Sequence, residues 1–182
     1  ISAISLPLTL PGYSSTPVHN FINGICEYGC NTPEKINDVY QIYNSAQLLA
    51  FAEYSKDCGS SSNVNGKLMA DIDLSSVDNW MPIGNTAREY YGTFDGNSHT
   101  IRGINCINSN AGLFAENYGT IENLIITDSY FEGTSYVAPI STENNKTIQN
   151  CRTNVTLKGT KSNTVVCGIS CNNNSSYPTR NN

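Results

Sequence analysis

Three aspartates, Asp71, Asp73 and Asp95, are the side chains in this 182-residue chain that could most readily hold a cation or act as acid and base. Asp71 and Asp73 lie in an alternating segment, so in a strand they would face one side, about 7 Å apart. That spacing suits a hard cation such as calcium, or acid–base work on a glycosidic bond. However, the pair also flanks a core strand, and Asp95-Gly96-Asn97 is a turn signature. We expect structural roles, with no catalytic residue and no metal ligand among the three.

A second candidate site is a possible zinc site near the N-terminus. His19, Cys26 and Cys30 could be three ligands, with Cys58 as a distant fourth. Zinc sites normally show two paired half-motifs, and only one half is present here. An oxidised Cys26–Cys30 pair, or free thiols in a mobile leader, fits the spacing better. His99 has no nucleophile or acid spaced to it in a catalytic order, so we expect it on the surface.

Composition narrows the class of partner. The formal net charge is -5 and only 14% of the residues are charged. This balance disfavours nucleic acid or an anionic membrane held by bulk charge, and it leaves sugars, proteins and cations open. No stretch is long and apolar enough to span a membrane. Abundant asparagine, which tolerates left-handed backbone, suits a fold with many tight turns.

Internal repeats are the main evidence for the fold. Residues 92–101 align with residues 112–121, and residues 140–151 align with residues 113–124. These two alignments have offsets of 20 (112 − 92) and 27 (140 − 113), and a further copy opens at Gly168. Repeats of this length indicate a solenoid, and the short segments rich in Ile and Thr favour strands over helices. We therefore predict an all-β protein, a right-handed parallel β-helix of about four coils.

The repeat alignment predicts which side chains stack inside the tube. The expected ladders are Ile101–Ile121–Ile148, Ile104–Leu124–Cys151 and Cys106–Ile126–Thr153. In these ladders Cys106 and Cys151 are small apolar fillers. Cys167 and Cys171 could join each other or stay unpaired, and the sequence does not choose between these states.

Two segments before the repeats complete the predicted domain. Residues 44–56 read as an amphipathic helix, with Asn44 or Ser45 as N-cap and an apolar stripe. Such a helix would cover the exposed end of the solenoid. Lys67 to Leu74 alternates as a half-buried strand. We assign residues 1–36 to a leader or spacer and residues 37–182 to the β-helix domain, with repeats over about 92–182. We expect the natural protein to continue beyond Asn182.

These segments carry a family resemblance. In order and spacing they resemble the surface β-helix proteins of gut bacteria with GLUG-type repeats, over about residues 40–173. The matching stretches are Tyr40–Leu48, Ala70–Leu74, Trp80–Gly84, Gly92–Ile101 and Gly112–Phe114. The resemblance implies a pectate-lyase-like right-handed β-helix, an extracellular or cell-surface location and an adhesin or stalk role. The segment with His19, Cys26 and Cys30 is also similar to a small motif in spacers of clostridial surface proteins, with its cysteines one residue further apart.

Two classes of function fit this reading. The first is an adhesion or interaction module that binds host or bacterial glycans or surface proteins, with no cofactor and no catalysis of its own. Its candidate surface aromatics are Tyr90, Tyr91, Tyr118, Tyr130 and Tyr136. The second is a polysaccharide-degrading lyase or glycosidase, which fold analogy alone supports. We expect the first, because no acid, base and nucleophile converge in the sequence pattern.

Overall fold

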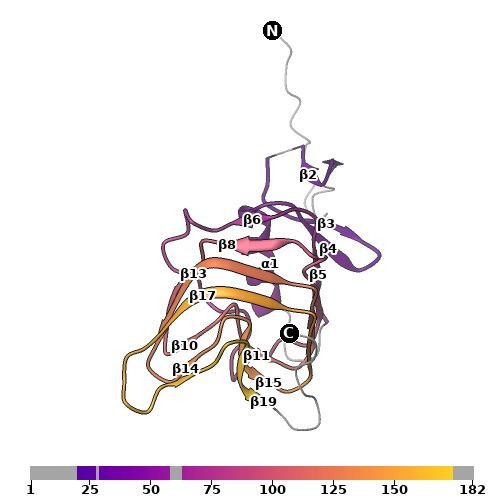
Figure 1. Ribbon diagram of the computed structural model, residues 1–182. Coiled ribbons are helices and arrows are strands. Elements are labelled where there is room, and N and C mark those ends of the chain that lie inside the picture. Colours follow the sequence, from indigo (N-terminus) through magenta and orange to yellow (C-terminus); the bar gives the residue numbers. More distant parts are fainter. Residues whose placement is uncertain (1–19, 28, 58–62, 174–182) are drawn as a thin grey trace, which may run out of the picture.

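The protein is a parallel β-solenoid of about five turns with one short helix near its N-terminal end (Figure 1). The computed structural model describes residues 20–27, 29–57 and 63–173. The fold class is as predicted, with one turn more than expected, because the solenoid begins before the repeats at residue 92. Among the described residues no helix has the length and apolar character needed to cross a membrane.

Each full turn passes through four faces, which we number in chain order. The first face holds β3 (Glu34–Ile36), β4 (Val39–Ile42), β5 (Asn65–Leu68), β7 (Thr93–Asp95), β12 (Thr120–Glu122) and β16 (Thr147–Gln149). The second face holds β6 (Ile72–Asp73), β8 (Thr100–Arg102), β9 (Asn105–Ile107), β13 (Ile125–Gly133) and β17 (Arg152–Gly159). The third face holds β10 (Asn110–Ala111), β14 (Tyr136–Val137) and β18 (Val165–Val166). The fourth face holds β11 (Phe114–Asn117), β15 (Ser141–Asn144) and β19 (Ser170–Asn173).

The register between turns confirms one predicted ladder contact and corrects others. Ile121 pairs with Ile148, as predicted, and both side chains are 0% exposed. The predicted partner Ile101 is wrong, because Ile121 pairs with Phe94 on the preceding turn. Ile101 lies on the second face and pairs with Ile126.

The error comes from a turn sequence that the chain uses twice within one coil. Residues 92–101 run round the corner from the first face to the second, whereas residues 112–121 run round the corner from the fourth face to the first. The offset of 20 therefore relates two corners, and true equivalents lie farther apart, such as Ile101 and Ile126 (126 − 101 = 25). For the same reason Cys106 pairs with Phe131, and not with Ile126.

Inward side chains form one continuous apolar core along the solenoid axis. Phe94 and Phe114 contact each other with ring centroids 5.4 Å apart, and Tyr90 lies 4.9 Å from Phe114. At the corner between the fourth and first faces, Asn117 and Asn144 are fully buried. Asn117 Nδ2 donates to Asn144 Oδ1 at 2.7 Å, so the amides satisfy each other from turn to turn.

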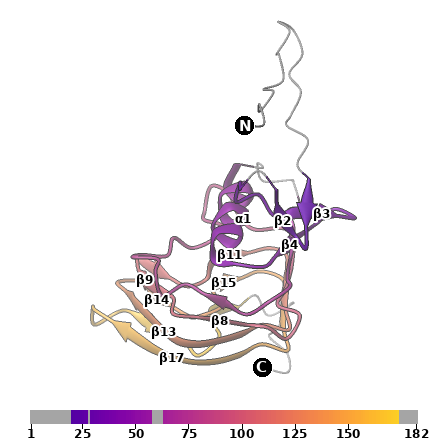
Figure 2. The same cartoon turned by 90° about the horizontal axis from the view of Figure 1, so that it is seen from above.

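Helix α1 (Ser45–Asp57) covers the N-terminal end of this core, as predicted. Asn44 caps it, because its Oδ1 accepts the backbone N–H of Gln47 at 2.9 Å. Since β4 and β5 are parallel neighbours, the chain completes a turn between them, and α1 takes the place of the other faces in that turn. Phe51 points into the core, 5.6 Å from Phe94. Figures 1 and 2 both show α1 beside β4 at the start of the solenoid.

The strand predicted over Lys67 to Leu74 is two strands, β5 and β6, separated by a bend. The chain must turn here from the first face to the second, so a continuous strand cannot form. Inward alternation nevertheless persists, because Leu68, Ile72 and Leu74 are buried. The prediction was therefore right about the buried side chains and wrong about the continuity of the strand.

Two antiparallel hairpins precede the helix. The first joins β1 (Phe21–Ile22) to β2 (Ile25–Cys26) through a turn with positive φ at Asn23 and Gly24. It is held against α1 by Gln47 Nε2, which donates to the Gly24 carbonyl at 2.7 Å. The second hairpin joins β3 to β4 and spans the boundary that we placed at residue 37.

Candidate functional site

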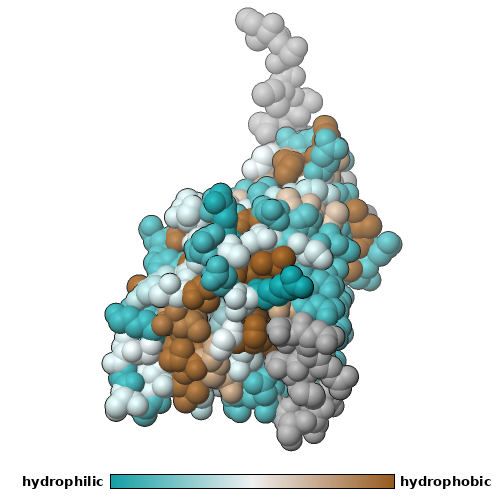
Figure 3. Space-filling view, viewed as in Figure 1, coloured by the Kyte–Doolittle hydropathy of each residue, from teal (hydrophilic) through white to brown (hydrophobic). Residues whose placement is uncertain are grey.

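The outer side of the second face is the broadest regular surface of the described chain. Strand alternation sends every second side chain of β8, β13 and β17 outward, and register aligns these side chains in columns across the turns. The columns contain Thr100–Ile125–Arg152, Arg102–Thr127–Asn154, Asn105–Tyr130–Thr156 and Ile107–Glu132–Lys158. Apolar, neutral polar and charged groups are mixed on this side of the molecule (Figure 3).

A β-bulge divides the second face. In β13 the register to β17 shifts between Thr127 and Tyr130, and Asp128 has a φ of 48°. Ser129 turns inward at the bulge, where its Oγ donates to the Thr127 carbonyl at 2.7 Å and accepts the Ile104 N–H at 3.0 Å. A shallow hollow of about 430 Å³ lies over the bulge, with Asp128, Tyr130, Asn154 and Thr156 among its lining residues.

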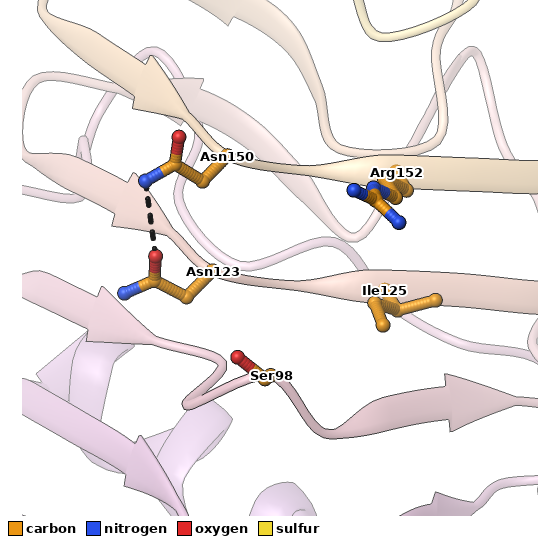
Figure 4. A pocket seen from close by; sticks show the side chains of 5 residues that line it. All are labelled: Ser98, Asn123, Ile125, Asn150 and Arg152. Atoms are coloured by element: carbon orange, nitrogen blue, oxygen red, sulfur yellow. Dashed lines mark hydrogen bonds between the residues drawn. The ribbon is translucent and has the colours of Figure 1, made fainter. Parts of the chain in front are cut away.

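A second hollow, of about 460 Å³, lies where the chain enters the same face (Figure 4). Its lining consists of Ser98, Asn123, Ile125, Asn150 and Arg152. Asn150 Nδ2 donates to Asn123 Oδ1 at 3.2 Å, so corner residues of successive turns are linked. Asn123 and Asn150 both have a φ of 54°, a conformation that asparagine tolerates better than most residues.

The aspartates singled out in the sequence are engaged in local contacts. Asp71 Oδ1 accepts the Thr100 N–H at 2.9 Å and lies 3.2 Å from His99 Nδ1. These contacts, the backbone hydrogen bond first, hold the pKa of Asp71 below its usual value. The pKa of Asp73 is lowered too, mainly by hydrogen bonds from Ser75. Asp73 Oδ2 also accepts a bond from Arg102 Nη2 at 2.7 Å.

Asp95 lies at the end of β7 on the first face, so the structure does not bring it into one site with Asp71 and Asp73. Partial burial acts to raise its pKa, but hydrogen bonds from Asn123, Asn97 and Lys67 outweigh burial and lower the pKa. Lys67 Nζ lies 3.2 Å from Asp95 Oδ2. Each aspartate therefore stabilises a corner or links two turns.

Acidification is expected to destabilise the protein through these carboxylates. Asp71, Asp73 and Asp95 all have a folded pKa below the usual value of 3.8. Such groups stabilise the fold fully above the unfolded pKa, and this contribution is lost as the pH falls through the folded pKa. The melting temperature should fall below about pH 4. In the Asp71→Asn, Asp73→Asn double variant that fall should be smaller, and an equal fall in both proteins would contradict this role.

The structure adds partners that the sequence did not indicate. His99 was expected on the surface without a partner, but it is half-buried beside Asp71, which lies 28 residues earlier. Tyr90 was expected on the surface, and this is wrong: it is 3% exposed, and its hydroxyl donates to the Val64 carbonyl at 2.9 Å. The other four candidate aromatics are half-buried at the surface, namely Tyr91, Tyr118, Tyr130 and Tyr136.

The cysteines divide by position. Cys106 and Cys151 are buried in the core as predicted, and burial raises the pKa of each thiol to about 11. A disulfide joins Cys167 to Cys171, which selects one of the two states that the sequence left open. Cys26 is buried in β2 and Cys30 is half-buried.

The zinc hypothesis involves two residues, His19 and Cys58, that lie outside the described part of the chain. Within residues 20–27, 29–57 and 63–173, no group of three or more His, Cys, Asp or Glu side chains is placed to hold a metal ion.

Neither a family model nor a curated protein sequence matches this chain. Among solved structures, the chain is similar to a candidate immunoglobulin A1 protease from Bacteroides ovatus, with 24% sequence identity and a TM-score of 0.58. The match covers 65% of this chain and 38% of that protein, so this chain spans well under half of its length. At this identity the likeness concerns the fold alone, and it supports the assignment of a parallel β-solenoid.

Proposed function

We propose that this chain is an extracellular or cell-surface interaction module that binds glycans across its second face and has no catalysis of its own. The proposal includes the resemblance to GLUG-repeat surface proteins, which share this architecture. A β-solenoid is a fold consistent with surface and extracellular proteins, and it presents aligned side chains on a rigid scaffold.

The observation that carries the proposal is the pair of hollows on the second face. Strand β17 joins them, because Arg152 lines one hollow and Asn154 and Thr156 line the other. All three side chains are exposed and point outward from one strand. Amide, hydroxyl and guanidinium groups beside an aromatic ring are the groups that bind sugar hydroxyls and pack on sugar rings.

The charges on this face also favour a glycan over a strongly charged partner. Glu132 is bound to Lys158 Nζ at 3.1 Å and accepts a hydrogen bond from the Tyr130 hydroxyl. Asp73 is bound to Arg102. Opposite charges therefore neutralise each other across neighbouring turns, and neutral hydrogen-bonding groups remain for a ligand.

Two features support a location outside the cell. The Cys167–Cys171 disulfide is typical of an oxidising compartment. The exterior is rich in asparagine, serine and threonine and poor in charge, which is compatible with contact with carbohydrate.

The proposed absence of catalysis rests on the engagement of the candidate acids. Asp71 and Asp73 are held by backbone hydrogen bonds and by basic side chains, which favour their ionised forms. A carboxylic acid that donates a proton at neutral pH needs a raised pKa instead. These two residues are therefore poorly suited to be the general acid of a glycosidase.

A glycan array tests the binding proposal, and affinities for the retained glycans are then measured by calorimetry. Arg152→Ala should weaken binding by about tenfold or more, since it removes a charged hydrogen-bond donor. Lys146→Ala is the matched control, because it removes one exposed positive charge at the corner between the fourth and first faces. If no glycan is retained, or if both variants bind like the parent, the second face is not a glycan site. Binding to host matrix proteins would then be measured instead.

A polysaccharide digestion screen tests the second half of the proposal. We expect no cleavage of acidic or neutral polysaccharides, with or without calcium. Cleavage that disappears in the Asp71→Asn, Asp73→Asn double variant would contradict the non-enzymatic reading and identify these residues as catalytic. Cleavage that survives in this variant would contradict the reading as well and place the activity elsewhere.

A further inference from the structure

Glu116, on the fourth face, is a buried carboxylate without a compensating partner. The residue is 7% exposed, and in the described part of the chain no donor forms a hydrogen bond or an ion pair with its carboxylate. Burial raises its pKa, and the negative charges of Glu143 and Glu89 raise it further. A buried charge that lacks a partner lowers the stability of a fold, so its presence calls for an explanation.

Glu116 belongs to a column of three glutamates on successive turns. It pairs in register with Glu143 of β15, and Glu143 pairs onward with Asn172 of β19. On the preceding turn Tyr90 bridges to Asn117, which places Glu89 at the level of Glu116. Like charges on neighbouring strands repel each other, and no basic side chain forms an ion pair with any of the three among the described residues.

A hollow of about 300 Å³ opens beside this column, and Glu116 lines it. Met81 and Pro82 contribute apolar surface, and Asn85 and Asn108 contribute amides. Lys56 also lines the hollow, but its ammonium group is bound to Glu53 at 2.7 Å. The hollow therefore combines a buried negative charge with an apolar wall, and its one lysine is already paired.

A pair of tyrosines lies next to the acidic column. The rings of Tyr91 and Tyr118 have centroids 5.4 Å apart. Burial raises the pKa of the Tyr118 hydroxyl, and the charges of Glu143, Glu116 and Glu89 raise it further, so this ring lies within the field of all three carboxylates. Aromatic faces attract cations, and carboxylates around them increase that attraction.

We propose that this acidic hollow on the fourth face binds an arginine or lysine side chain presented by a basic segment of a partner protein. The cationic group would pair with Glu116, its alkyl stem would pack on Met81 and Pro82, and neighbouring basic residues would contact Glu143 and the tyrosine pair. Basic side chains suit such a site because they combine an apolar stem with a charged end. This surface is separate from the glycan face and implies a second partner.

Calorimetry with a short acetylated and amidated peptide, in which arginine alternates with glycine, tests this inference on the full chain. Glu116→Gln should weaken binding by about tenfold or more, since it removes a charge-assisted hydrogen bond and keeps the side-chain shape. Glu122→Gln is the matched control, because Glu122 is a half-buried glutamate on the first face of the same turn. It changes the net charge equally and should alter binding by less than about twofold.

Folding controls keep the outcomes distinct. Glu116→Gln should melt at or above the temperature of the parent at neutral pH, because it removes a buried and repelled charge. Glu143→Gln, at the half-buried neighbouring position, should also weaken peptide binding. The inference is overturned if the parent does not bind the peptide, if Glu116→Gln binds as tightly as the parent, or if Glu122→Gln weakens binding as much. It is also overturned if the citrulline version of the peptide, or free arginine amide, binds as well as the arginine peptide.

Discussion

Replacing Ile121 by aspartate is expected to unfold the domain. Ile121 is fully buried between Ile148 on the next turn and Phe94 on the preceding turn. A carboxylate at this position would lose apolar contacts on both sides and would have no hydrogen-bond donor within the core. The loss should exceed about 4 kcal/mol, which is comparable with the total stability of about 5–15 kcal/mol typical of a single domain.

Circular dichroism and thermal melting of the purified variant measure this effect. Ile125→Asp provides the matched control, because Ile125 is on the same turn but points outward and is half-buried on the second face. We expect the control to fold with a melting temperature close to that of the parent. A folded Ile121→Asp protein, or equal losses in both variants, would show that the inward register of this turn is wrong.

Removing the helix should have the second large effect. A chain that begins after Tyr54 would lack most of α1 and the strand β4 that precedes it. The edge of β5 would lose its hydrogen-bonded neighbour, and the buried side chains of Leu68 and Phe94 would lose the cover of Phe51. Unpaired strand edges beside exposed apolar side chains promote association, so we expect this truncated protein to aggregate.

Size-exclusion chromatography of the truncated protein checks this expectation. A chain that lacks only residues 1–19 keeps every described element and should remain monomeric at the same concentration. Phe51→Ala gives a graded version of the test, with an expected loss of about 3–5 kcal/mol for a fully buried phenylalanine. A monomeric, cooperatively folding chain that begins after Tyr54 would show that α1 does not protect the end of the solenoid.

The two proposed binding surfaces could be foreseen from the sequence to different degrees. Tyr130 was a surface candidate from the start, and the outward position of Arg152 follows from strand alternation. The bulge at Asp128 and Ser129 was not indicated, because a bulge is a difference in length between neighbouring turns. The column of Glu89, Glu116 and Glu143 was not recognised either, since the spacings between its members depend on the length of each coil.

The sequence by itself determined the features that depend on neighbouring residues. Strand alternation showed which side of each strand is buried, as at Leu68 and Ile72. The N-cap and apolar stripe located the helix, and the offset of 27 residues correctly paired Ile121 with Ile148. These features could be read because side-chain periodicity and capping act over a few residues of one segment.

Only the tertiary structure decided the contacts between turns. Successive coils differ in length, from 25 residues between Ile101 and Ile126 to 29 residues between Ile72 and Ile101. No single offset therefore aligns them, and the sequence could not show that Asp71 meets His99. Similar turn sequences at two different corners added a false equivalence between residues 92–101 and residues 112–121. Which side chains stack depends on where each corner falls in space, and that is settled only when all the turns pack round one core.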